Sequence, residues 1–177
     1  MLNLRIPLKI WQQMTYYTKI CLPNEVTGIG TLKKLKNGDL EVERLFLPYQ
    51  KISTFLCTFE DTALHSIITD LMVEGKSEEV EKLKFRWHSH GYGKCFFSGT
   101  DKKDISEWSG DWVVNLVMNA DNQYLARADI FEPICIEDYP VNVLIDYPMN
   151  RRLFDICKGE IDARVSVSKK KGEKLIV

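Results

Sequence analysis

The segment LKFRWHSH alternates apolar and polar side chains and ends at His90. Alternation with a period of two residues predicts a β-strand. Phe85 and Trp87 then point to one face of the strand, and Arg86, His88 and His90 point to the other. Any sheet that contains this strand must therefore bury the aromatic face and turn the face with two imidazoles toward a polar site.

Two imidazoles at positions i and i+2 of one strand can converge on a single cation without straining the backbone. After His88 and His90, the segment GYGKCFFSGT leads to Asp101, which is far enough along the chain for it to double back. Two histidines and one carboxylate form a ligand set that is typical of zinc and leaves a fourth position for water. A His-x-His pair alone is more often a polar strand edge than a metal site, but the addition of Asp101 favours one catalytic Zn²⁺ held by His88, His90 and Asp101.

Hydrolysis at such a centre also needs a base that is not itself a metal ligand. Glu25 is the candidate, because it opens a strand-like segment next to Gly28 and Gly30, although spacing alone does not single it out. Ser98 can donate its hydroxyl to the oxyanion of a tetrahedral intermediate. Ser98 and Asp101 also fit a helix N-terminus, with Ser98 as the cap, and this interpretation is compatible with the first.

Other polar residues are weaker candidates for chemistry. His65 falls within a predicted helix without a spaced partner, so we expect it to be structural or exposed. The five cysteines are odd in number and include no Cys-x-x-Cys pair, which predicts inert thiols. Cys95 beside the histidines raises the alternative of a thiol protease, but no nucleophile signature surrounds it, so packing is favoured. Trp87 and Trp112 are expected in the core.

The periodicity predicts alternating helices and strands along the chain. The expected elements are a helix from Pro7 to about Lys19, a hairpin of strands 25–32 and 40–47 around Asn37-Gly38, a helix over about 60–74, a strand over 83–90, a short helix from Thr100 or Asp101, and strands over 112–119, 124–131, 134–137 and 141–146. The segment 149–164 is ambiguous, with a helix favoured. The fold class expected is α+β and sandwich-like, with a curved, mostly antiparallel β-sheet flanked by helices.

The 177 residues fit a single domain, which we place at 1–165, followed by a lysine-rich tail over 166–177. The 24 basic and 25 acidic residues nearly cancel, so no field attracts nucleic acid or an anionic membrane. Apolar runs are too short for a membrane span, and no signal peptide is visible. A soluble, cytoplasmic protein that contacts neither nucleic acid nor membrane is expected.

Together, Glu25, His88-x-His90, seven further residues and Ser98-x-x-Asp101 resemble the JAMM motif of the MPN/JAB zinc metalloprotease family. The order of elements over roughly residues 5–146 is also similar to that family. The resemblance implies a single MPN/JAB domain, one zinc on the two histidines and the aspartate, Glu25 as general acid/base, and Ser98 as support for the transition state. It also implies hydrolysis of a peptide or isopeptide bond at the C-terminal tail of a ubiquitin-like or other protein substrate.

One position departs from the family pattern. Many eukaryotic deubiquitinases carry proline after the second histidine, whereas this chain has Gly91. Its segments EVTGIG and SGTD resemble those of prokaryotic or phage-type JAB domains. A JAB metallopeptidase with a substrate unrelated to ubiquitin is therefore one alternative. A non-catalytic MPN scaffold is another, but such scaffolds usually lose metal ligands, and here all are present. Only residues 47–59 and the turns after Asp101 are available to grip a substrate.

Overall fold

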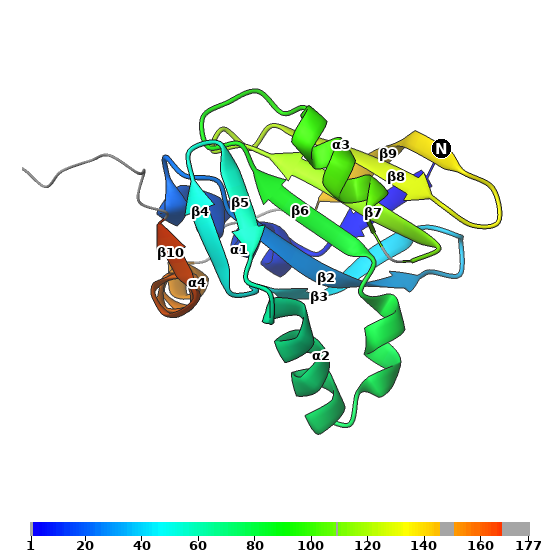
Figure 1. The fold of residues 1–177 in the computed structure, drawn as a ribbon, viewed down its shortest axis with the longest axis horizontal. Helices are drawn as coiled ribbons and strands as arrows, with labels where there is room; N and C mark the ends of the chain where they lie inside the picture. The colour runs from blue at the N-terminus through cyan, green and yellow to red at the C-terminus, as the bar shows by residue number, and fades with distance from the viewer. Residues whose placement is uncertain (1, 109, 146–150, 168–177) are drawn as a thin grey trace, which may run out of the picture.

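The structure is a computed structural model that describes residues 2–108, 110–145 and 151–167. Its main sheet contains seven strands, which are β1 (Leu2–Ile6), β2 (Thr27–Lys34), β3 (Leu40–Phe46), β6 (Phe85–Ser89), β7 (Trp112–Met118), β8 (Tyr124–Ile130) and β9 (Ile136–Ile145). They form a closed barrel in the order β1-β3-β2-β6-β7-β8-β9, with β9 returning to pair with β1 (Figure 1).

This closed barrel contradicts the predicted fold class, a sandwich-like curved sheet flanked by helices. β1 runs parallel to both β3 and β9, and β6 runs parallel to β7, so the sheet is mixed. The prediction failed at the N-terminus, where Leu2–Ile6 was not recognised as a strand. Barrel closure pairs Leu2 with Val141, and local periodicity contains no information about a contact between opposite ends of the chain.

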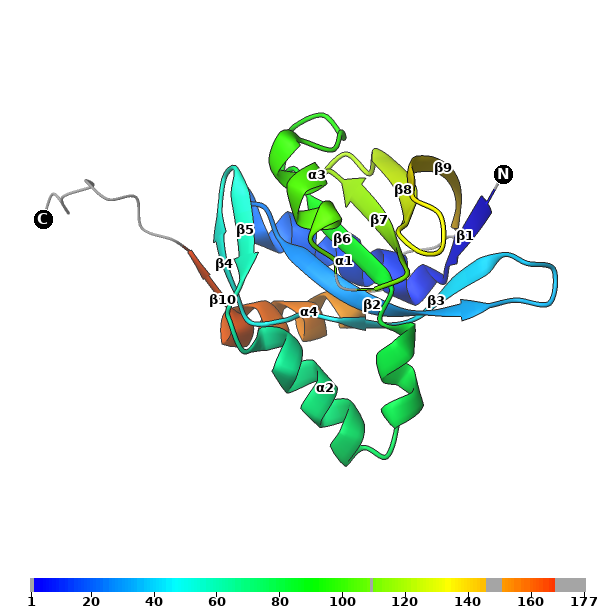
Figure 2. The same cartoon turned by 45° about the vertical axis from the view of Figure 1, so that its right-hand side comes forward.

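The helical elements are α1 (Leu8–Cys21), α2 (Ala63–Val73), the 3₁₀ helix η1 (Ser77–Lys82), α3 (Gly99–Ser106) and α4 (Arg151–Arg164). α1 contributes Trp11 and Met14 to the largest buried cluster, and α4 adds Leu153 and Cys157 to the same cluster. α2 packs on Ile29 of β2, and α3 packs on β7 (Figure 2). Among the described residues, no helix is long and apolar enough to cross a membrane.

A second, three-stranded sheet lies beside the barrel. It contains β4 (Gln50–Ser53), β5 (Leu56–Phe59) and β10 (Val165–Val167) in the order β10-β4-β5, so β5 is an edge strand. No strand was predicted over residues 48–59, because segments of four residues are too short to show a period. The tail predicted from residue 166 contributes two residues to β10, and positions 168–177 lie outside the described residues.

Most of the other predicted elements are confirmed with small changes at their ends. The helix predicted from Pro7 is α1, the helix predicted over 60–74 is α2, and the ambiguous segment forms α4 over its described part. The hairpin turns at Gly38, whose φ of +89° requires the freedom of glycine. The strands predicted over 134–137 and 141–146 are one continuous strand, β9.

Candidate metal centre

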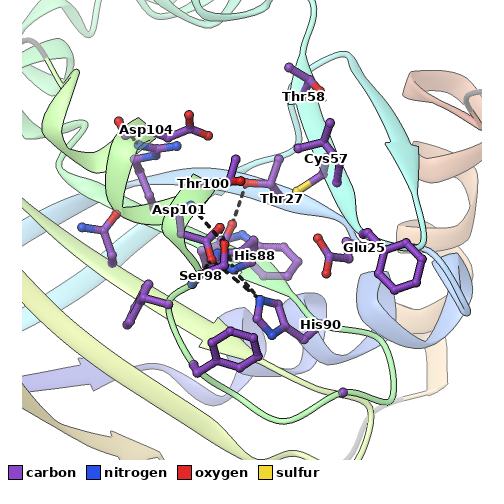
Figure 3. A pocket seen from close by; sticks show the side chains of 18 of the residues that line it. Glu25, Thr27, Cys57, Thr58, His88, His90, Ser98, Thr100, Asp101 and Asp104 are labelled. Atoms are coloured by element: carbon purple, nitrogen blue, oxygen red, sulfur yellow. Dashed lines mark hydrogen bonds and ion pairs between the residues drawn. The ribbon is translucent and has the colours of Figure 1, made fainter.

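The three predicted metal ligands lie together. His88 is in β6, His90 follows it by two residues, and Asp101 is in the first turn of α3 (Figure 3). Their ligand atoms all lie within 4.8 Å of one another. The two Nε2 atoms are 3.1 Å apart, and the carboxylate oxygens of Asp101 lie 3.4 Å from Nε2 of His88 and 3.9 Å from Nε2 of His90.

These separations fit a small tetrahedral cation. Zinc-to-nitrogen and zinc-to-oxygen bonds of about 2.0–2.1 Å at tetrahedral angles place ligand atoms roughly 3.3 Å apart. Nδ1 of His90 is 2.8 Å from the carbonyl oxygen of Lys94. A backbone acceptor at that nitrogen favours its N–H form, which leaves Nε2 with a free lone pair for a metal. The donor set and its geometry therefore fit one zinc ion with an open fourth position.

Asp101 is held in place by the start of α3. The hydroxyl of Ser98 accepts a hydrogen bond from the backbone N–H of Asp101 at 3.2 Å, and Oδ2 of Asp101 accepts one from the backbone N–H of Ser98 at 2.6 Å. This reciprocal capping box confirms the helix N-terminus expected from the sequence. Because the Ser98 oxygen acts as an acceptor here, its own proton remains available to a substrate oxygen.

The protonation states also suit a cation. Burial lowers the pKa of His88 to about 4, more than the neighbouring Asp101 raises it, so this imidazole is neutral at physiological pH. Burial alone would raise the pKa of Asp101, but electrostatic interaction with His88 and His90 and the hydrogen bonds with Ser98 lower it. A neutral imidazole and an ionised carboxylate are the forms that bind a metal ion.

Glu25 faces the same cavity from the other side (Figure 3). It precedes β2 by two residues, and its backbone N–H donates to the carbonyl oxygen of Ser53 at 2.9 Å. Burial, together with the negative charge of Asp101, raises the pKa of Glu25 to about 7. A carboxyl group with this pKa can both accept and return a proton near neutral pH.

Two buried side chains that the sequence did not single out fix the chain next to Glu25. The hydroxyl oxygen of Ser89, between the two histidines, accepts a hydrogen bond from the backbone N–H of Val26 at 3.0 Å. Gln50 accepts from the N–H of Thr27 at 3.0 Å and donates to the carbonyl of Thr27 at 2.9 Å. Ser89 and Gln50 hold this backbone only because β2 pairs with β6 and β4 lies beside β2. The one signal in the sequence was the position of Ser89 between two candidate ligands.

A buried ion pair supports the loop between the histidines and α3. Arg127 pairs with the fully buried Asp129, and its guanidinium carbon lies 5.5 Å from the centre of the Phe97 ring. The Phe97 ring also contacts the imidazole of His88, whose ring centre is 6.2 Å away. Phe97 therefore contacts both a cation held by an ion pair and a candidate metal ligand, which restricts the orientation of His88.

The site opens into a cavity of about 670 Å³. Its walls come from β6, the start of α3, the residue Glu25 and the hairpin of β4 and β5, which contributes Phe55 and Cys57 (Figure 3). Phe55 at the tip of this hairpin is 82% exposed. An exposed aromatic ring at the edge of this cavity is suited to contact a bound chain.

The remaining candidates lie outside the centre or contribute only packing. His65 is exposed on α2, as expected. Cys95 donates to the carbonyl oxygen of Gln123 rather than to a histidine, and burial raises its pKa to about 11, so the structure does not support the thiol-protease alternative. Trp87 is buried against Tyr17, and Trp112 is half-buried.

No family model and no curated protein sequence matches this chain. Among solved structures, the chain is similar to the solution structure of protein DSY2949 from Desulfitobacterium hafniense, with a TM-score of 0.50 and 14% sequence identity. The match covers 85% of this chain and 97% of that chain. At this level of identity the similarity concerns the fold alone.

Proposed function

We propose that this protein is a zinc-dependent JAMM-type metallopeptidase that hydrolyses a peptide or isopeptide bond. One cavity brings together three side chains that could hold a metal ion and a carboxyl group whose pKa is raised to about 7, and this observation carries the proposal. His88, His90 and Asp101 would hold the metal ion. Glu25, which is not among these ligands, would be the general acid/base.

When bound, zinc supplies Lewis acidity that lowers the pKa of water to about 7 and polarises a carbonyl group. Glu25 accepts a proton from the attacking water and later transfers it to the nitrogen of the leaving amine as the C–N bond breaks. The hydroxyl of Ser98 donates a hydrogen bond to the carbonyl oxygen as it becomes an oxyanion. The products are a carboxylic acid and a free amine, and Glu25 returns to its starting state.

The substrate class that we propose is an extended protein tail, such as the C-terminus of a ubiquitin-like protein. β5 supports this proposal, because it is an edge strand whose residues line the cavity. An edge strand can bind an extended peptide through backbone hydrogen bonds. All five cysteines are free, which is compatible with a reducing compartment, and we propose that the protein acts in the cytoplasm.

Gly91 favours the alternative in which the metallopeptidase acts on a different protein substrate. Its φ is +51°, in the left-handed region, whereas proline is restricted to about −65°. A Cβ at this position would also lie 3.0 Å from the carbonyl oxygen of Pro23. The loop after His90 therefore has a backbone course that a chain with proline here could not adopt, so the rim of the cavity differs from that of deubiquitinases with this proline.

Metal analysis and a cleavage screen test the proposal together. Purified protein is expected to contain about one zinc per chain, as a centre with three protein ligands requires. It should cleave at least one member of a panel of C-terminal fusions to ubiquitin-like proteins and other tails. Glu25→Gln should retain the zinc and lose the cleavage. Cleavage at the wild-type rate by this variant or by metal-free protein would contradict the mechanism, and a protein without zinc that forms a stable complex would favour a scaffold instead.

A further inference from the structure

Arg86 lies on β6 close to the candidate metal centre. It lies two residues before His88 on β6, where exposure alternates, so both side chains point to the same face. Residues at this spacing are about 6.6 Å apart along a strand. Arg86 lines the cavity of the metal centre and also a neighbouring cavity of about 710 Å³ beside α2 and α3. Its guanidinium therefore stands where the two cavities meet.

The guanidinium of Arg86 has few partners within the protein. It donates one hydrogen bond to the backbone carbonyl of Asp104 at 3.2 Å, and its central carbon lies 5.5 Å from the centre of the Trp108 ring. Burial lowers the pKa of Arg86 more than the negative charges of Asp104 and Asp101 raise it. Within the described part of the chain no carboxylate forms an ion pair with this guanidinium. A guanidinium has five N–H donors, so donors remain for a ligand.

Other arginines of this protein are neutralised differently. Arg44 and Arg127 each form ion pairs with two carboxylates. Arg86 is instead held by a ring and a backbone carbonyl, which position the guanidinium without cancelling its charge. A positioned cation that lines a substrate cavity and lacks an ion pair is suited to bind an anion.

We propose that Arg86 binds a carboxylate of the substrate, carried by a residue within about two positions of the bond that is cleaved, since an extended chain rises about 3.3 Å per residue. The planar guanidinium offers two parallel hydrogen bonds to a carboxylate. Arg86 is therefore a specificity-determining residue, and the substrate is a tail with an acidic residue near the scissile bond. This inference rests on the proposed function and specifies its substrate.

A pair of short peptide hydroxamates tests the inference without requiring turnover. The hydroxamate group binds zinc, and the two peptides differ only in carrying Glu or Gln at the two residues next to it. Calorimetry on zinc-loaded wild-type protein is expected to show a preference of about tenfold for the Glu peptide, because charge-assisted pairs are the stronger ones. The preference should shrink as salt is added.

Variants of the protein identify the side chain that is responsible for the preference for the Glu peptide. Arg86→Gln should bind both peptides equally, and Arg86→Lys should keep part of the preference, because lysine retains the charge without the planar fork. Lys103→Gln is the matched control, since this lysine is on α3 with 73% of its side chain exposed, and it should keep the full preference. Zinc content shows that each variant has kept its centre.

The outcomes separate the two proposals. If wild-type protein binds both hydroxamates with equal affinity, the role of Arg86 is wrong while the metal centre stands. A preference for the Glu peptide that persists in Arg86→Gln would also show that the role of Arg86 is wrong. If the protein takes up no zinc, or binds neither hydroxamate, the proposed function fails and the inference fails with it.

Discussion

Replacing Glu25 by glutamine is expected to stabilise the metal-free protein at alkaline pH while abolishing hydrolysis by the zinc-loaded protein. Burial and the charge of Asp101 raise the pKa of Glu25 from 4.5 to about 7 in the folded state. In the unfolded chain the carboxyl group is exposed and loses its proton near its ordinary pKa. At a pH between these two pKa values, Glu25 has lost its proton in the unfolded state and retains it in the folded state.

The free energy of unfolding of the wild type should therefore fall as pH rises through this window, and the full penalty should be present above pH 7. Each tenfold change in proton affinity corresponds to about 1.4 kcal/mol, so the penalty from ionised Glu25 amounts to about 3 kcal/mol. Glutamine has nearly the same shape and carries no charge at any pH. Glu25→Gln should then exceed the wild type by up to about 3 kcal/mol at alkaline pH and by little under acidic conditions.

Urea unfolding in the presence of a chelator, at an acidic and an alkaline pH, measures this difference. Glu78→Gln is the matched control, because Glu78 is exposed on η1, where a substitution should change stability by less than about 0.5 kcal/mol. Equal stability of Glu25→Gln and wild type at alkaline pH would refute the reasoning. It would mean that solvent reaches the Glu25 carboxylate or that the chain relaxes around it.

Four other changes test the centre and its supports. Asp101→Asn should reduce the zinc content from about one per chain to none, as measured by metal analysis. It should also remove the stabilisation that zinc gives the wild type in thermal melts, which is about 2.7 kcal/mol when free zinc exceeds its Kd a hundredfold. Ser98→Ala should lower the hydrolysis rate roughly 100-fold, because the oxyanion loses a hydrogen bond, and this loss is measured by kinetics. It should also lower the free energy of unfolding by about 1 kcal/mol, because α3 loses its cap, and this loss is measured by urea unfolding. Gln50→Leu leaves the backbone groups of Thr27 without partners and should cost about 2–3 kcal/mol in urea unfolding, and an unchanged stability would show that water replaces the amide. Gly91→Ala should cost about 1–2 kcal/mol, because alanine is strained at a φ of +51° and its Cβ meets a backbone oxygen; a neutral result would show that the loop after His90 adapts.

The sequence by itself determined which side chains are candidate metal ligands and the local geometry that brings them together. Alternation placed His88 and His90 on one face of a strand, and the structure has them in and beside β6 with facing nitrogens. The spacing from Ser98 to Asp101 predicted a helix N-terminus, and a capping box is present there. These features depend on residues close together in the chain, where the period of a strand and the hydrogen bonds of a helix cap act directly.

Tertiary structure alone decided which distant residues join the centre and how the sheet closes. Glu25 reaches the cavity because β2 pairs with β6, with Ser89 bonding to Val26 across 63 residues of chain. Closure through β1 and β9, which overturned the expected curved sheet flanked by helices, is likewise a pairing of distant segments. The contacts of Arg86, which include no ion pair with any described residue, became visible only once α3 brought the carbonyl of Asp104 to it and the chain after α3 brought Trp108. Such contacts are selected by the free energy of the whole packed chain, so no local pattern could specify them.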